Sequence, residues 1–414
     1  MTSRPESLLP EQFGPLQGVR ILSTGTIVAE PFAAALAAEM GAEVIQIERP
    51  GIGDVTRSLS TPIGGQDQPR MNALWLQDRR NTFYTTLDFT VPAGKEMFLR
   101  LIAGADIWME SSKAGTYSNW GLDDATVLAV NPAIVITHVS GYGQTGHPDY
   151  LNRASYDPIG QAFGGTMGIT GSPDPEPPMT ARPLAADYTT AQMCLWSTLA
   201  AYIYSQRTGR GQVIDLAQFE AVHKVMSGTM VDYFETGIDP ERLGNQSGRG
   251  QPFGSYQAKD GWVVVAALGA VFDRLCAVLG LDTTDGYWQN ARNDVSSIVG
   301  VEFDAILRGW LEERTVEEVV AKLNAAQVGC SEVMTPSAIA ENPHYQAREI
   351  HTEWEDLQLG RKVKGIGVIP KFSETPGKIW RGSVSLGYDN DLVYERYLGL
   401  GNDELAQLRD RGVI

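Results

Sequence analysis

The sequence predicts an α/β protein with a large, doubly wound, mainly parallel Rossmann-like domain and a second, smaller α+β domain. Within the first fifty residues, two short apolar runs flank an alanine-rich helical segment, which is typical of a βαβ crossover between parallel strands. The same alternation of strand-like and helix-like segments continues to about residue 217, and the pattern changes from Tyr256 onward. A chain of 414 residues, of which 43% are hydrophobic, is long enough to build both cores.

The crossover at the start of the chain consists of a strand over 18–23, a helix over 30–40 and a strand over 43–48. Pro31 occupies a first-turn position of this helix and Gly41 follows its end, as helix termini prefer. The later elements repeat this alternation of strand and helix. The further strands are expected at 106–110, 133–139, 212–217 and 261–267. The further helices are expected at 95–103, 191–204 and 218–236, with a capped helix at 402–408.

The domain boundaries are placed where the composition and the pattern change. Residues 1–225 form the large domain, which the C-terminal segment 345–414 completes. A glycine-rich, polar stretch lies within the linker 226–255, and the small α+β domain occupies 256–344. We expect the C-terminal helix to pack back on the large domain.

The net charge of −17 argues against a nucleic-acid-binding protein and against attraction to anionic membranes. Cys194, Cys276 and Cys330 are widely spaced, so neither a disulfide framework nor a metal site is indicated, and Cys194 is interpreted as a core residue. The N-terminus has no apolar run of signal-peptide length, and Asp273 and Arg274 interrupt the most apolar window. We therefore expect a soluble, cytoplasmic protein without a transmembrane span.

The turn after the first strand tests whether the predicted fold binds a nicotinamide dinucleotide. Gly25 is the one glycine in residues 23–29, whereas the phosphate-binding fingerprint needs three, so this hypothesis is disfavoured. Arg49 and Arg57 instead follow the second strand, at the edge where ligands of open α/β sheets bind, and arginine suits a phosphate. An acidic protein must gather positive charge locally to bind a phosphorylated ligand, and the candidate residues of the first third are Arg49, Arg57, Arg70, Arg79, Arg80 and Lys113.

A single carboxylate, Asp187, lies between a proline-rich loop at 171–178 and the long apolar helix at 191–204. At or near a helix N-terminus, free N–H groups and the helix dipole are expected to stabilise its ionised form. An ionised carboxylate held at a loop–helix junction is what a nucleophilic aspartate requires. A simple N-cap is the alternative interpretation of the same residue.

Taken in order, these segments resemble the class III CoA-transferases, the family that includes formyl-CoA transferase, carnitine CoA-transferase and the methylacyl-CoA racemases. The matching segments are 16–22, 41–50 with Gly53-Asp54, 86–88, 131–135, 140–146, Asp187 and 208–212, while 230–234 and 376–382 resemble the carnitine branch more closely than the formyl branch. The resemblance implies that Asp187 is the catalytic aspartate, which takes CoA from an acyl-CoA donor and passes it to a free carboxylic acid. The implied intermediates are an aspartyl mixed anhydride and an aspartyl-CoA thioester, and N–H donors after Asp187 could serve the tetrahedral intermediates.

The resemblance also bears on cofactors and assembly. Coenzyme A and acyl-CoA enter as substrates of the large domain, and no tightly bound cofactor is implied. Chains of this family form an interlocked dimer, so a homodimer is expected, with a heteromer containing a paralogous subunit as the alternative.

Several CoA contacts are implied by position. Ala29, Arg49, Lys113 and Tyr142 are the residues expected to bind CoA, with Arg49 at the nucleotide end. Val28 stands where formyl-CoA transferase has a glutamine, which puts specificity for oxalate and formate in doubt.

Two further segments bear on the reaction. Tyr156 stands where the racemases have a histidine base, and a tyrosine with a pKa near 10 is a poor proton acceptor at neutral pH. His147 lies nine residues earlier and is expected to be a loop residue, which counts against racemisation. Gly248 and Gly250 lie about where formyl-CoA transferase has a mobile glycine loop, and an ordinary linker is the alternative.

The acceptor is expected to be an acid of the carnitine or butyrobetaine type, or another small hydroxy or dicarboxylic acid. A trimethylammonium group would be recognised by aromatic rings, and the candidates are Trp75, Trp108, Trp120 and Tyr156. Two other functions stay open: an α-methylacyl-CoA racemase or epimerase, and a non-catalytic partner subunit of a heteromeric CoA-transferase.

Overall fold

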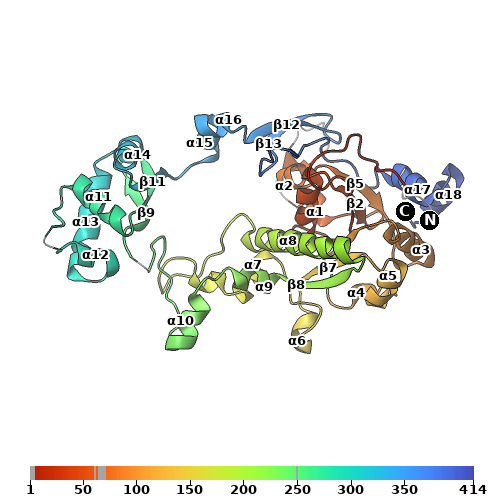
Figure 1. Ribbon diagram of the computed structural model, residues 1–414, viewed down its shortest axis with the longest axis horizontal. Coiled ribbons are helices and arrows are strands. Elements are labelled where there is room, and N and C mark those ends of the chain that lie inside the picture. Colours follow the sequence, from red (N-terminus) through yellow and green to blue (C-terminus); the bar gives the residue numbers. More distant parts are fainter. Residues whose placement is uncertain (1–4, 60–61, 64–70, 249, 285) are drawn as a thin grey trace. The chain divides into compact units, whose positions relative to one another are not determined.

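The computed structural model describes residues 5–59, 62–63, 71–248, 250–284 and 286–414. The chain divides into two units, each assembled from separate stretches of sequence (Figure 1). The first unit comprises Met1–Thr166, Arg182–Ser227 and Ala347–Ile414, and the second comprises Met167–Ala181 and Gly228–Gln346.

A six-stranded sheet, parallel throughout, forms the centre of the first unit, which confirms the predicted fold class there. Its order is β5-β2-β1-β6-β7-β8, and the strands are β1 Arg20–Ser23, β2 Glu43–Glu48, β5 Thr82–Thr86, β6 Ile107–Glu110, β7 Val135–Ser140 and β8 Gln212–Ala217. Ile21 pairs with Val44 on one side and with Ile107 on the other. The strand order reverses between β1 and β6, so the loops that leave these two strands diverge where ligands of open α/β sheets bind.

Two helices that pack on each other cover one face of this sheet, α1 (Ala29–Glu39) and α8 (Ala185–Thr208). Small side chains form the contact of α1 and α8 with the strands. Ala34 and Ala38 of α1 lie in one buried cluster with Ala191 and Cys194 of α8. Cys194 is a buried core residue, as predicted.

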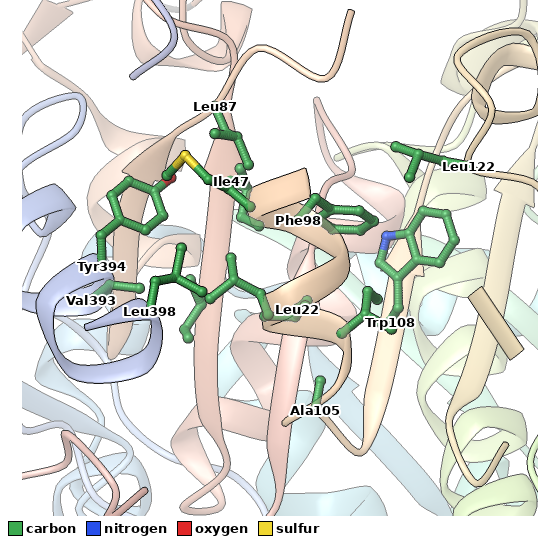
Figure 2. Packing of buried hydrophobic residues seen from close by; sticks show 14 of the residues in the cluster. Leu22, Ile47, Leu87, Phe98, Ala105, Trp108, Leu122, Val393, Tyr394 and Leu398 are labelled. Carbon is green, nitrogen blue, oxygen red and sulfur yellow. The ribbon is translucent and has the colours of Figure 1, made fainter. Parts of the chain in front are cut away.

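The opposite face carries α3 (Pro92–Ile102), α5 (Asp124–Val130) and the C-terminal helices α17 (Asn390–Leu398) and α18 (Asn402–Asp410). Figure 2 shows side chains of this core, which include Leu22, Ile47, Phe98, Trp108 and Tyr394. Leu405 of α18 and the terminal Ile414 belong to the same cluster, so the C-terminal helix packs back on the first unit, as predicted.

Two predicted helices differ from the observed ones. The helix predicted over 218–236 is two helices, α9 (Gln218–Lys224) and α10 (Thr229–Thr236), because Ser227 adopts a left-handed backbone with φ of 57° that an α-helix cannot contain. The helix predicted over 191–204 begins earlier, at Ala185, so that Asp187 lies inside its first turn.

The second unit contains an antiparallel sheet of order β11-β10-β9, packed against helices around a separate core. Its strands and principal helices are β9 Phe253–Ala258, β10 Gly261–Ala266, β11 Gly329–Glu332, α10, α11 Ala270–Leu279, α12 Gln289–Asn293, α13 Ile298–Glu312, α14 Val316–Ala325 and α15 Pro336–Glu341. The remaining elements are β3 Pro62–Ile63, β4 Met71–Asn72, β12 His351–Asp356, β13 Arg361–Ile366, α2 Ala73–Asp78, α4 Thr116–Asn119, α6 Pro148–Leu151, α7 Asp157–Phe163, α16 Pro343–Ala347 and the 3₁₀ turns Val55–Arg57 and Thr166–Ile169. Across the described ranges, no helix has the length and apolar character needed to span a bilayer.

Candidate active site

The turn between β1 and α1 is fixed by a buried ion pair. Ile27 adopts a left-handed backbone with φ of 74°, which is costly for a β-branched residue. Asp54 Oδ2 accepts the N–H of Ile27 at 3.1 Å, and the Arg79 guanidinium donates to the Ile27 carbonyl. Arg79 and Asp54 also pair with each other at 3.2 Å, and both are buried. This pair therefore holds Val28 and Ala29 at the carboxyl edge of the sheet.

The start of α8 is capped by a second carboxylate. Asp157 Oδ1 accepts the N–H of Ala186 at 2.7 Å and that of Asp187 at 3.1 Å. The next N–H, that of Tyr188, is bonded to the Leu184 carbonyl within the helix. The expectation that N–H donors of this helix serve the reaction is therefore wrong for these three groups, because each already has an acceptor.

Burial changes the acidity of Asp187. Asp187 is 6% exposed, and its removal from water is the main cause of its raised pKa. The nearby charge of Asp157 is the second cause. The hydrogen bond from Gln218 opposes both effects, and the pKa stands at about 7. The expectation of a carboxylate stabilised in its ionised form is thus wrong, since the capped helix end does not offset the loss of water. In the described part of the chain no cation pairs with this carboxylate.

Asp187 lines a pocket of about 100 Å³ at the carboxyl edge of the sheet. Three of the predicted site residues, Val28, Ala29 and Tyr156, line the same pocket. The other lining residues are Thr26, Ile27, Ser111, Val139, Ser140, Gly141, Ser155 and Gln218. Residues from the β1–α1 turn, the loop after β6, the end of β7, the loop before α7, and the starts of α8 and α9 therefore meet around one carboxylate.

The predicted basic cluster is largely engaged in internal ion pairs. Arg57, Arg79 and Arg80 pair with Glu48, Asp54 and Glu39, respectively, and Arg79 and Arg80 are fully buried. These three guanidinium groups are structural, so the interpretation of them as phosphate ligands is wrong. Arg70 lies outside the described residues.

Arg49 and Lys113 are exposed and do not line the pocket. The Lys113 ammonium donates to the Asn152 carbonyl at 3.0 Å. Both side chains belong to the first unit and lie at its surface, which leaves them accessible to an anionic ligand.

The predicted Tyr142 contact lies outside the pocket lining, in an aromatic cluster with Tyr150, Phe163 and Phe219. Gly248 and Gly250 belong to the second unit.

The predicted aromatic cage does not assemble in the first unit. Trp75 and Trp108 are fully buried in the core, and Trp120 stacks on Phe89. Tyr156, which is 56% exposed, is the one member of the set that lines the pocket.

Among the residues of the site that were not predicted are Ser155, Asp157 and Gln218. Ser155 and Asp157 flank the predicted Tyr156, and Asp157 precedes a proline at a helix start, which is a capping signal. Gln218 follows β8 directly and so sits at the carboxyl edge of the sheet, which was the available signal for it.

Comparison with known proteins gives the family of the chain. The model of CoA-transferase family III matches residues 16–390. A bile acid CoA-transferase, BaiK of Clostridium scindens, is 35% identical over 97% of this chain and 90% of its own, and an L-carnitine CoA-transferase of a Proteus species is 33% identical over 99% and 98%. The crystal structure of a CAIB/BAIF family protein from Brucella suis is 27% identical, with a TM-score of 0.80 over 93% of this chain and 100% of that one. The chain therefore belongs to CoA-transferase family III and is a CoA-transferase.

Proposed function

We propose that this chain moves CoA from an acyl-CoA donor to a free carboxylic acid, with Asp187 as the covalent nucleophile. The observation that carries the proposal is the Asp187 carboxylate itself, which lines the pocket at the switch point of the sheet. Its pKa near 7 means that a large fraction is ionised at neutral pH, and no cation among the described residues pairs with it and so reduces its nucleophilicity.

The proposed sequence consists of four acyl transfers. Asp187 attacks the donor thioester carbonyl and releases CoA thiolate, which leaves a mixed anhydride. The thiolate attacks the aspartyl carbonyl and expels the donor acid, which gives an aspartyl-CoA thioester. The acceptor carboxylate attacks this thioester and releases thiolate again, and the thiolate then attacks the acceptor carbonyl of the second anhydride. The products are the acceptor-CoA and free Asp187, so one difficult exchange becomes a series of easier steps.

The N-terminus of α1 supports the donor half of this chemistry. Val28 is its N-cap residue and offers no side-chain hydrogen bond to the first turn, and both Val28 and Ala29 line the pocket with Asp187. N–H groups at a helix start favour developing negative charge, so an oxyanion from the thioester carbonyl would be stabilised here.

The proposed acyl-CoA contacts are Ala29 near the thioester, Arg49 and Lys113 at the anionic nucleotide end, and Tyr142. The acceptor is proposed to be a carnitine-type, small hydroxy or dicarboxylic acid, and the name of the Clostridium relative adds bile acids to this set. The pocket lining contains Ile27, Val28 and Val139 and a single aromatic ring, which does not favour a cation cage formed by this unit alone.

Three assembly features remain proposals. We propose an interlocked homodimer, the domain boundaries given above, and Gly248 and Gly250 as substrate or loop residues. Light scattering on the purified protein tests the dimer, since a monomeric mass would contradict it.

The function is tested by incubating the protein with one acyl-CoA and a panel of labelled acids that includes carnitine, butyrobetaine, a bile acid, a hydroxy acid and a dicarboxylic acid. Transfer of CoA to an acid supports the proposal. Exchange of an α-proton without an acceptor would instead indicate a racemase or epimerase. Inertness of the isolated chain, followed by activity with a paralogous subunit, would indicate a heteromeric enzyme.

A further inference from the structure

A hydrogen-bond relay reaches Asp187 from the side of α7 and α9. The Ser155 hydroxyl donates to Gln218 Oε1 at 3.0 Å, and Gln218 Nε2 donates to Asp187 Oδ1 at 2.5 Å. Gln218 is 5% exposed, and all three residues line the same pocket. An ionised carboxylate only accepts hydrogen bonds, so Asp187 selects the NH₂ end of the Gln218 amide and leaves Oε1 for the Ser155 hydroxyl.

Two glycines leave the space that this relay occupies. A Cβ on Gly160 of α7 would lie 2.6 Å from Gln218 Oε1 and 2.9 Å from its Cγ. A Cβ on Gly141, after β7, would lie 2.3 Å from the Ser155 Cβ. Neither glycine has a positive φ in the structure, so the reason for glycine at both positions is the close approach of the relay. Figure 1 shows α7, α8 and α9 lying together, which brings these groups into contact.

We propose that Gln218 is a catalytic hydrogen-bond donor to the aspartyl group and that Ser155 is the residue that positions it. This inference rests on the proposed function, because it assigns a role in the chemistry at Asp187. Gln218 occupies Oδ1, so Oδ2 is the oxygen that attacks the donor thioester.

The same bond becomes stronger at the two steps in which the aspartyl carbon is attacked. When the CoA thiolate attacks Cγ of the mixed anhydride, the C–S bond forms and the carbonyl electron pair moves onto Oδ1. The pair returns as the Cγ–Oδ2 bond breaks and the donor acid leaves as its carboxylate. Attack of the acceptor carboxylate on the thioester runs through the reverse arrangement and expels thiolate. In both tetrahedral species Oδ1 carries the negative charge, and Gln218 Nε2 is already placed to stabilise it.

The test compares Gln218→Leu and Gln218→Met with the wild-type protein in full CoA transfer and in single-turnover formation of the aspartyl-CoA thioester. Both variants remove the donor, and the methionine keeps the length of the side chain and fills the space beside Gly160. We expect both to lower kcat by about 10²–10³-fold, the loss typical of an oxyanion donor, and to slow thioester formation by a similar factor. Wild-type kcat in Gln218→Met, or in a folded Gln218→Leu, would overturn the inference.

The control is Gln77→Leu, which removes a glutamine whose two hydrogen bonds both go to the backbone of Ile366. We expect this variant to keep kcat close to that of the wild type. An equal loss in Gln77→Leu would show that the effect of Gln218 is a general loss of structure.

Ser155 is tested by a double-mutant cycle. Ser155→Ala is expected to lower kcat about tenfold with little change in KM for the acyl-CoA, and to cause no further loss in the Gln218→Leu background. Additive losses would contradict a positioning role. Should the wild-type protein form no aspartyl-CoA thioester at all, the proposed function itself would fail, whereas normal thioester formation in the Gln218 variants would refute the relay alone.

Discussion

Asp157 accepts the backbone N–H of Asp187 at 3.1 Å, so a second carboxylate caps the very residue proposed as the nucleophile. The charge of Asp157 raises the pKa of Asp187, in addition to the larger effect of burial. Its other oxygen accepts from Gln161 Nε2 at 2.7 Å, which keeps the cap in place. The cap therefore orders the start of α8 and at the same time brings the Asp187 pKa close to neutrality.

Replacing Asp157 by asparagine should separate these two effects. The amide oxygen can still accept the N–H groups of Ala186 and Asp187, but the negative charge is lost. We expect the pKa of Asp187 to fall, so the acid limb of kcat/KM for the acyl-CoA, which lies near pH 7 in the wild type, moves to lower pH. A pH–rate profile of Asp157→Asn measures this shift. An unchanged midpoint, or one at higher pH, would show that the limb does not report Asp187.

Asp187→Asn should make the protein more stable at alkaline pH. The folded-state pKa of about 7 lies above the usual aspartate value, so between pH 4 and 7 the unfolded chain loses this proton while the folded chain keeps it. The wild-type protein therefore loses folding stability as the pH rises from 4 through 7, because the buried carboxyl must then ionise, and below pH 4 this loss is absent. At about 1.4 kcal/mol per pKa unit, the variant should gain up to about 4 kcal/mol in free energy of unfolding at pH 8, and little below pH 4. Denaturant unfolding at both pH values tests this, and a gain that is the same at both would contradict it.

The Arg79–Asp54 pair should matter for activity as well as for stability, because it holds the strained Ile27 turn. Arg79→Met leaves a buried carboxylate without its partner and should cost about 3–5 kcal/mol of unfolding free energy. The turn that presents Val28 and Ala29 would relax, so kcat should fall at least tenfold at a temperature at which the variant is folded.

Arg80→Met is the matched control, because Arg80 is equally buried and pairs with Glu39 rather than with the turn. We expect a similar loss of stability from it but a kcat near that of the wild type. Equal kcat values in the two folded variants would contradict the role assigned to Arg79.

The Lys113 ammonium is expected to bind the nucleotide phosphates of CoA by electrostatic attraction. Lys113→Ala should raise KM for an acyl-CoA several-fold and should leave KM unchanged for the corresponding acyl-pantetheine, which has no nucleotide phosphates. Lys362→Ala, an exposed lysine on β13, serves as the charge control. An equal rise with both substrates, or the same effect from Lys362→Ala, would remove Lys113 from the binding site.

Local patterns were enough to predict five of the six strands of the first unit's sheet, all except β5, and to place Asp187 near the start of a helix. Apolar runs that alternate with helical segments define β1, β2 and β6 because buried parallel strands need them, and a proline-rich loop before an apolar helix marks the start of α8. The site around the carboxylate could not be predicted in the same way. Gln218 lies 31 positions from Asp187 and contacts it only through the packing of α9 on α8.

The roles and ionisation states of charged side chains were the hardest features to predict from the sequence. Arg79 and Arg80 follow one another on the chain and look like part of a phosphate site, yet each pairs with a carboxylate far away in sequence. The ionisation of Asp187 was misjudged for a related reason, since its helix N-terminus is visible in the sequence but its burial and its neighbour Asp157 are not. Desolvation and ion pairing depend on tertiary contacts, and these decide which charges face a ligand.

The most direct test of the account is mass spectrometry of the protein after incubation with an acyl-CoA donor and hydroxylamine. We predict a hydroxamate on the peptide that contains Asp187, dependent on the donor, and neither adduct nor CoA transfer in Asp187→Asn. An Asp187→Asn protein that transfers CoA at the wild-type rate, or an adduct that maps to another residue, would contradict the assignment of Asp187 as the nucleophile.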